Sequence, residues 1–81
     1  MSQNAPKNVV VYTRDGCHLC DDAAQLLRAH GLVPRLVDID ADPALRAVHH
    51  EWVPVVEIDG VVRFRGRIEP VLLRRLLADA N

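Results

Sequence analysis

A short run of β-branched residues near the N-terminus constrains the fold of this chain more than any other feature. Asn8–Thr13 contains three consecutive valines and no alternation of polar and apolar residues, which is typical of a strand buried on both faces. A helical pattern follows from about Cys17 and ends at Gly31, which suits the residue after a helix C-terminus. A second strand over Pro34–Ile39 then predicts a parallel, right-handed β-α-β unit. The expected apolar face of the helix consists of Leu19, Ala23, Leu26, Leu27 and His30.

The middle of the chain predicts a short helix and a β-hairpin. Asp42-Pro43 combines an N-cap residue with a proline at the first helical position, and we expect this helix to end at Glu51. Two apolar runs, Val55–Ile58 and Val61–Arg65, flank Asp59-Gly60. Because Asp-Gly is among the strongest signals for a two-residue hairpin turn, we expect these runs to be paired antiparallel strands.

Pro70 begins the last predicted helix. The element order is therefore βαβαββα, and no repeat or linker interrupts it. We expect a single α/β domain over residues 1–81, with a flexible N-terminal segment at 1–7. The expected apolar face of the last helix consists of Val71, Leu72, Leu73, Leu76 and Leu77.

Composition excludes several classes of protein. Hydrophobic residues make up 49% of the 81, enough for one core. Ten Lys and Arg stand against eleven Asp and Glu, so there is no basic surplus, and we expect no nucleic-acid partner. No apolar run is long enough for a membrane span, and the polar start of the chain does not resemble a signal peptide. We therefore expect a cytoplasmic monomer that does not bind membranes.

The chemistry is expected at the junction between the first strand and the first helix. Cys17 and Cys20 form a C-x-x-C motif, and the i, i+3 spacing on a helical turn brings two Cα atoms within disulfide range. The helix N-terminus stabilises a thiolate on the first cysteine, so we assign Cys17 as nucleophile and Cys20 as resolving thiol. His18 is either a residue that tunes the thiolate or an exposed polar residue. Arg14 is expected to lower the pKa of Cys17, and Asp15 to oppose it.

Other uses of the two cysteines are less well supported. A bond between them closes too short a loop to staple the fold. A zinc site needs four ligands, and the chain has no second cysteine pair, while His49 and His50 are adjacent and not spaced for chelation. A c-type haem attachment is excluded because Asp21, and not histidine, follows the motif. Redox chemistry is favoured, with a metal or cluster site and buried structural cysteines as alternatives.

Together these residues resemble the glutaredoxin-like family of the thioredoxin superfamily, in its short Cys-His-Leu-Cys type. The resemblance rests on Tyr12–Cys20, Val53-Pro54, Asp59-Gly60 and Gly66, and it covers the chain from Val9 to about Leu77. It implies a thioredoxin-like fold with a four-stranded mixed sheet in the order 2-1-3-4. The first and third helices would cover one face of this sheet, and the second helix the other.

The resemblance also implies a substrate site around the cysteines. It makes the Val53-Pro54 bond cis, with the Val53 backbone free to pair with an extended thiol substrate. Arg14 stands where relatives carry lysine, and it would bind a glutathione carboxylate. Gly66 and Arg67 stand where relatives have a Gly-Gly pair in the second half of the glutathione site. Arg67 in place of glycine, and Pro70 without an N–H, depart from the family pattern.

The sequence as a whole predicts a thiol–disulfide oxidoreductase that acts in electron transfer and cell redox homeostasis. Its partners would be protein or low-molecular-weight disulfides and a thiol reductant. We expect no metal and no bound cofactor, with glutathione as a candidate co-substrate. Two alternatives remain: a carrier of a metal or iron–sulfur cluster that uses Cys17 with a partner thiol at a dimer interface, and a redox-inactive thioredoxin-fold binding module.

Overall fold

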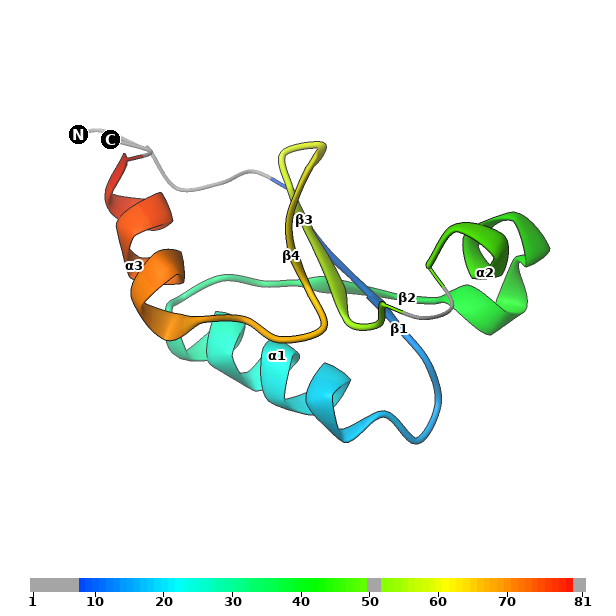
Figure 1. The fold of residues 1–81 in the computed structure, drawn as a ribbon. Helices are drawn as coiled ribbons and strands as arrows, with labels where there is room; N and C mark the ends of the chain where they lie inside the picture. The colour runs from blue at the N-terminus through cyan, green and yellow to red at the C-terminus, as the bar shows by residue number, and fades with distance from the viewer. Residues whose placement is uncertain (1–7, 50–51, 80–81) are drawn as a thin grey trace.

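Four strands form one mixed sheet in the computed structural model, which describes residues 8–49 and 52–79 (Figure 1). The strands are β1 (Val9–Thr13), β2 (Arg35–Asp38), β3 (Val55–Ile58) and β4 (Val61–Arg65). Their order in the sheet is β2-β1-β3-β4, with β1 parallel to β2 and antiparallel to β3. The thioredoxin-like topology and the strand order expected from the sequence are confirmed.

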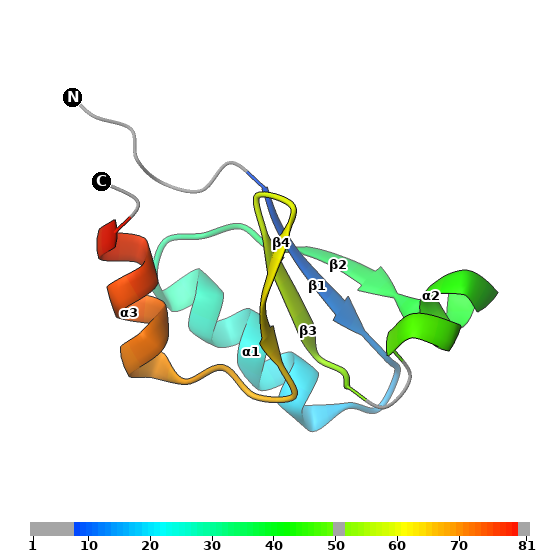
Figure 2. The same cartoon turned by 45° about the horizontal axis from the view of Figure 1, so that its top comes forward.

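The helices lie on both faces of this sheet. They are α1 (His18–Ala29), a 3₁₀ turn η1 (Ile39–Ala41), α2 (Pro43–His49) and α3 (Pro70–Asp79). Figure 2 shows α1 and α3 together on one side of the sheet, with α2 apart from them at the far end. The Tyr12 ring of β1 stacks on the His49 ring of α2, with centroids 4.7 Å apart, so α2 contacts the opposite face near the end of β1.

The hydrophobic core fills the space between the sheet and the α1 and α3 face. Alternate residues of β1 and β3 point into it, as the two-residue period of a strand requires. Leu27 and Leu73, which are both fully buried, bring α1 and α3 onto these strands. The buried cluster consists of Val9, Val11, Ala23, Leu27, Leu32, Val56, Ile58, Phe64, Ile68 and Leu73.

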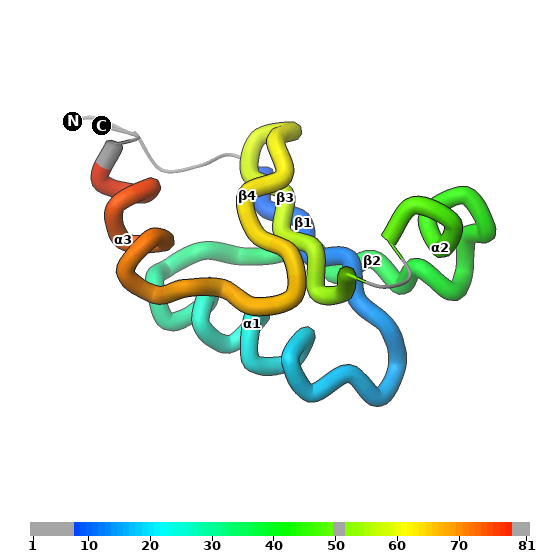
Figure 3. The backbone as a smooth tube through the Cα atoms, in the orientation of Figure 1, coloured from blue at the N-terminus to red at the C-terminus, as the bar shows by residue number. Residues whose placement is uncertain are grey.

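β1 is buried fully on one face only, which corrects the expectation of a strand covered on both sides. Val9 and Val11 are buried, whereas Val10 and Tyr12 are half-buried. The reason is the short α2, which lies beyond the end of β2 (Figure 3) and leaves much of this face open. A shallow recess of about 480 Å³ opens beside Val10 and Glu57 on this side.

The predicted helix faces need correction at three positions. Leu19 is 48% exposed, and in α3 Val71 and Leu72 are 49% and 50% exposed. The buried positions of α1 include two alanines, whose small side chains let the helix approach the sheet closely. Leu19 lies in the first turn of the helix and lines a surface recess with Ala23 and Leu26. The buried residues of α1 are Cys20, Ala23, Ala24 and Leu27.

The turn signals in the sequence predicted the local structure well. The hairpin strands have the expected bounds, and Asp59 and Gly60 adopt φ angles of 51° and 85°, as this turn requires. The second strand is shorter than predicted because Asp38 caps the turn η1 through its side chain, which ends β2. The expected helix end at Glu51 and the flexible segment at 1–7 lie outside the described residues. No helix in the described part of the chain is long and apolar enough to span a membrane.

Candidate active site

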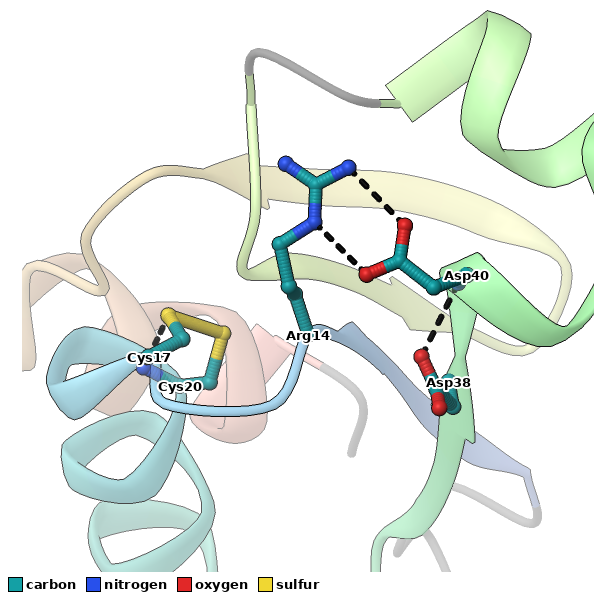
Figure 4. Close-up of polar contacts among 5 residues, drawn as sticks. All are labelled: Arg14, Cys17, Cys20, Asp38 and Asp40. Carbon is teal, nitrogen blue, oxygen red and sulfur yellow. Dashed lines mark hydrogen bonds and ion pairs between the residues drawn. A yellow bond between two sulfur atoms is a disulfide. The ribbon is translucent and has the colours of Figure 1, made fainter.

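Cys17 and Cys20 are joined by a disulfide at the N-terminus of α1 (Figure 4). After β1 the chain turns at residues 14–16, and the Cys17 N–H donates to the Arg14 carbonyl at 3.2 Å. Cys17 is the N-cap residue of α1, and its extended backbone places Cys20 in the first helical turn. The Cα atoms are 5.2 Å apart, within the range that the i, i+3 spacing predicts.

The two sulfur atoms have different environments. Cys20 is only 3% exposed and faces the sheet, whereas Cys17 is half-buried and reaches the surface. The Cys20 N–H donates to the Cys17 Sγ at 3.1 Å. A helix N-terminus favours negative charge, so the same N–H would stabilise a thiolate on Cys17 after the disulfide is reduced. The arrangement therefore offers one accessible sulfur with a second sulfur directly behind it.

The Arg14 side chain points away from the disulfide (Figure 4). Its side chain extends from the loop toward Asp40 (Figure 4), and it forms a bidentate ion pair there. Nε donates to Oδ2 at 2.9 Å, and a terminal nitrogen donates to Oδ1 at 3.0 Å. These hydrogen bonds lower the pKa of Asp40 and raise the pKa of Arg14. The guanidinium expected to lower the pKa of Cys17 is thus held by a carboxylate.

Sequence reasoning missed Asp40, although the β-α-β unit contained the signal. In the parallel pairing of β1 and β2, Thr13 lies opposite Asp38. Residues that follow the two strands therefore emerge at the same edge of the sheet, which brings Arg14 close to Asp40. The Asp38 carboxylate then accepts a hydrogen bond from the Asp40 N–H at 2.9 Å and holds this turn in place.

The remaining predicted site residues lie at the same end of the sheet as the disulfide. Tyr12 and Arg65 both pair with Val55 from opposite sides, so the chain before Val55 and the chain after Arg65 lie beside the end of β1. The Gly66 N–H donates to the Trp52 carbonyl at 3.0 Å and to the Pro54 carbonyl at 2.8 Å. The structure thereby joins two of the segments that the resemblance assigned to substrate binding.

The segment Trp52–Pro54 presents both backbone and side chain at this end of the sheet. The Val53-Pro54 peptide bond is cis. Trp52 is 54% exposed, and Val53 is half-buried. An exposed indole next to an accessible strand end is suited to contact an extended peptide.

Arg67 lies on a recess beside the first turns of α1. The recess has a volume of about 370 Å³, and its lining residues are Leu19, Asp22, Ala23, Leu26, Arg67, Ile68 and Pro70. Its floor is largely apolar, with one acidic and one basic side chain. Nearby, the Val71 N–H at the start of α3 donates to the Glu69 carboxylate at 3.0 Å. The chain therefore caps this helix N-terminus with its own carboxylate.

Two other predicted residues have less direct roles. His18 is exposed between the cysteines. His49, expected only to favour the end of its helix, is 8% exposed and stacked on Tyr12, whose hydroxyl donates to Glu57 at 3.3 Å. Because side chains of a strand point alternately to opposite faces, Tyr12 could have been placed on the face of β1 away from the core. No local pattern in the sequence identified His49 as the residue that stacks on it. His50 lies outside the described residues.

Within 8–49 and 52–79, no three His, Cys, Asp or Glu side chains form a group that could hold a metal ion.

The ion pair at this site predicts a measurable pKa difference. In the Arg14→Gln variant the Asp40 carboxyl loses both hydrogen bonds, so its pKa should rise toward the ordinary value of 3.8. A carboxyl whose pKa is lowered by folding stabilises the fold above its unfolded pKa. That contribution is lost as the pH falls through the folded pKa. The measurement is an NMR titration of the Asp40 carboxyl carbon.

Arg28→Gln is the matched control, because it removes the same charge at the far end of α1. We expect the Asp40 titration to be unchanged in this control. Equal Asp40 pKa values in the wild type and in Arg14→Gln would contradict the ion pair.

Several solved structures share the fold of this chain. A structural-genomics target protein from X. campestris is 35% identical, with a TM-score of 0.74 over 90% of this chain and 99% of that chain. The holo form of glutaredoxin C1 from Populus tremula x tremuloides is 28% identical, with a TM-score of 0.66 over 95% and 87% of the two chains. A protein from Nitrosomonas europaea shares the fold at 23% identity, with a TM-score of 0.79 over 94% and 96%.

Among curated proteins, none matches this chain. The family model for the glutaredoxin-like domain (DUF836) matches residues 8–78, which include both cysteines, the Val53-Pro54 segment and the start of α3. The fold, the C-x-x-C pair at the N-terminus of α1 and this match support a thiol redox function. The chain belongs to the glutaredoxin-like domain family of the thioredoxin superfamily.

Proposed function

We propose that this protein is a thiol–disulfide oxidoreductase that reduces protein or low-molecular-weight disulfides through Cys17 and Cys20. The observation that carries the proposal is the asymmetry of the pair at the N-terminus of α1. Cys17 reaches the surface, whereas Cys20 is buried behind it with its N–H directed at the Cys17 sulfur. A nucleophilic thiol needs access and a stabilised thiolate, and a resolving thiol needs only proximity.

The proposed reaction consists of two thiol–disulfide exchanges. The Cys17 thiolate attacks one sulfur of the substrate disulfide, forms a mixed disulfide and releases the first substrate thiolate. Cys20, once deprotonated, attacks the Cys17 sulfur, which forms the intramolecular disulfide and releases the second substrate thiolate. The two released thiolates take up protons from solvent, so the substrate gains two electrons and two protons. An external dithiol, or two molecules of a monothiol, then reduces the Cys17–Cys20 disulfide by the same two exchanges and is itself oxidised to a disulfide.

The loop that contains Pro54 supports a role in substrate binding. Val53 and the exposed Trp52 lie next to the end of β3. We propose that an extended substrate segment pairs with the Val53 backbone and packs on Trp52 while its disulfide reaches Cys17. In this proposal the protein acts on protein disulfides as a monomer in the cytoplasm, and an external thiol system recycles it.

A turnover assay with a redox titration tests the proposed function. The reduced protein is mixed with hydroxyethyl disulfide and a dithiol reductant, and the 2-mercaptoethanol that forms is measured by chromatography, because total thiol stays constant in this exchange. We expect turnover above the uncatalysed rate and a single two-electron transition for the Cys17–Cys20 couple. Protein whose thiols were first alkylated with iodoacetamide serves as the control. If the Cys17–Cys20 disulfide can be reduced but the protein does not accelerate reduction of the substrate, the proposal is contradicted and a redox-inactive binding module is supported.

A further inference from the structure

Two arginines from different elements line a recess next to the Cys17 loop. Arg14 precedes the loop, Arg46 comes from α2, and together with Pro43 and Ala47 they line about 400 Å³ of space. Guanidinium groups bind carboxylates through paired hydrogen bonds, so a recess of this composition is suited to an anion. β1 ends at Thr13 and Arg14 follows it directly. The Cys17 N–H then donates to the Arg14 carbonyl at 3.2 Å. Arg14 and Cys17 thus belong to one short loop, so the charges around Arg14 contribute to the electrostatic potential that a substrate meets at Cys17.

The chain already supplies an anion there. The Asp40 carboxylate holds Arg14 through two hydrogen bonds, and Arg46 also lowers the pKa of Asp40 through its charge. Asp40 is positioned firmly, since its N–H is held by Asp38 and its neighbour Ile39 is fully buried. A tethered partner acts at an effective concentration of about millimolar or more, so a dilute external carboxylate competes poorly with it.

The start of α3 also holds a carboxylate of the chain, close to the first turns of α1. The Glu69 carboxylate accepts the Val71 N–H, and the preceding position, Pro70, has no N–H to donate. This helix end adjoins the first turns of α1, because Pro70 and Leu19 line the same recess. That recess also has one acidic and one basic side chain, Asp22 and Arg67. The chain thus supplies its own carboxylate at two places, with Asp40 at Arg14 and Glu69 at the start of α3.

We propose that Asp40, assisted by Glu69, is a specificity-determining residue that excludes carboxylate-bearing thiols and disulfides from Cys17. The substrates of the site are then neutral or cationic disulfides, such as protein disulfides flanked by lysine or arginine. This inference rests on the proposed oxidoreductase function. It also predicts that a neutral dithiol recycles the protein better than an anionic thiol such as glutathione.

The first test compares substrates of different charge within one protein. Values of kcat/KM are measured with dithiodiglycolate, an anion, hydroxyethyl disulfide, which is neutral, and cystamine, a cation. We expect the wild type to prefer the neutral and cationic disulfides. In Asp40→Asn the anion-to-neutral ratio should rise about tenfold, because one negative charge beside Arg14 and Arg46 is then removed. The gain should disappear in the Arg14→Gln/Asp40→Asn double variant.

Asp59→Asn is the matched control for this series. It removes one carboxylate from the hairpin at the opposite end of the sheet, where Asp59 contacts Asn8. The anion-to-neutral ratio should stay at its wild-type value in this control. A wild type that uses the anionic disulfide as well as the neutral one overturns the proposal, as does an unchanged ratio in Asp40→Asn.

A second test does not depend on turnover. In the Cys20→Ser background Cys17 is the only thiol of the chain, and its thiolate displaces iodide from iodoacetate or from iodoacetamide. The rate ratio of these two reagents reports the electrostatic potential at Cys17 even if the protein reduces no disulfide. We expect Asp40→Asn to raise the iodoacetate-to-iodoacetamide ratio several-fold at low salt, and less at high salt. An unchanged ratio at low salt overturns the inference independently of the proposed function.

Discussion

We expect the proposed disulfide reduction to fall to the uncatalysed rate when Cys17 is replaced by serine. The accessible sulfur at the α1 N-terminus is then absent, and Cys20, at 3% exposure, is too buried to meet a substrate. Cys20→Ser should behave differently. Its Cys17 still attacks the substrate, but no thiol resolves the product, so a mixed disulfide accumulates.

The two outcomes are distinguished by steady-state release of the substrate thiol and by intact-protein mass spectrometry. Cys20→Ser should carry the mass of one substrate thiol, and this adduct should disappear on treatment with a dithiol. Cys17→Ser should carry no adduct. Equal activity in the two variants, or an adduct on Cys20 in Cys17→Ser, would falsify the assignment of nucleophile and resolving thiol.

Replacing Leu27 with alanine should cause a large loss of stability. Leu27 is fully buried between α1 and the sheet, in the cluster that also contains Leu73. Truncating a fully buried leucine costs about 2–5 kcal/mol, because apolar contacts are lost and a cavity remains. The free energy of unfolding of a typical domain is only about 5–15 kcal/mol, so this substitution would remove a large fraction of it. Urea denaturation measures the free energy of unfolding by linear extrapolation.

Leu72→Ala is the matched control, because the same atoms are removed from α3 at a side chain that is 50% exposed. We expect a loss below about 1 kcal/mol there. If both variants lose the same free energy of unfolding, the burial of Leu27 does not govern stability, and the packing of α1 described above is wrong.

Local signals predicted the elements of this fold because each signal acts within a few residues. The Asp59-Gly60 turn requires two positive φ angles, which few other dipeptides tolerate, and it determined both hairpin strands. Asp42 caps α2 through its bond to the Ala44 N–H, as the N-cap pattern predicted. The C-x-x-C spacing likewise predicted the separation of the two cysteines, since one helical turn determines it.

Patterns of hydrophobicity were less reliable for burial. A helical period identifies an apolar stripe, but it does not say how wide a stripe the neighbouring sheet can cover. In α3 only Leu73 is fully buried, while Val71 and Leu72 remain half exposed. β1 was expected to be covered on both faces, and α2 proved too short to cover the second face.

The sequence by itself determined the family, the order of the elements and the place of the cysteine pair at a helix N-terminus. These follow from backbone preferences and from spacings within one turn. Only the tertiary structure decided the electrostatics of the site. In the sequence Arg14 resembles an anion-binding residue. In the folded protein its guanidinium is paired with Asp40, which is 26 residues away along the chain. Which charge meets which depends on the register of strands far apart in the chain, and no local pattern contains that information.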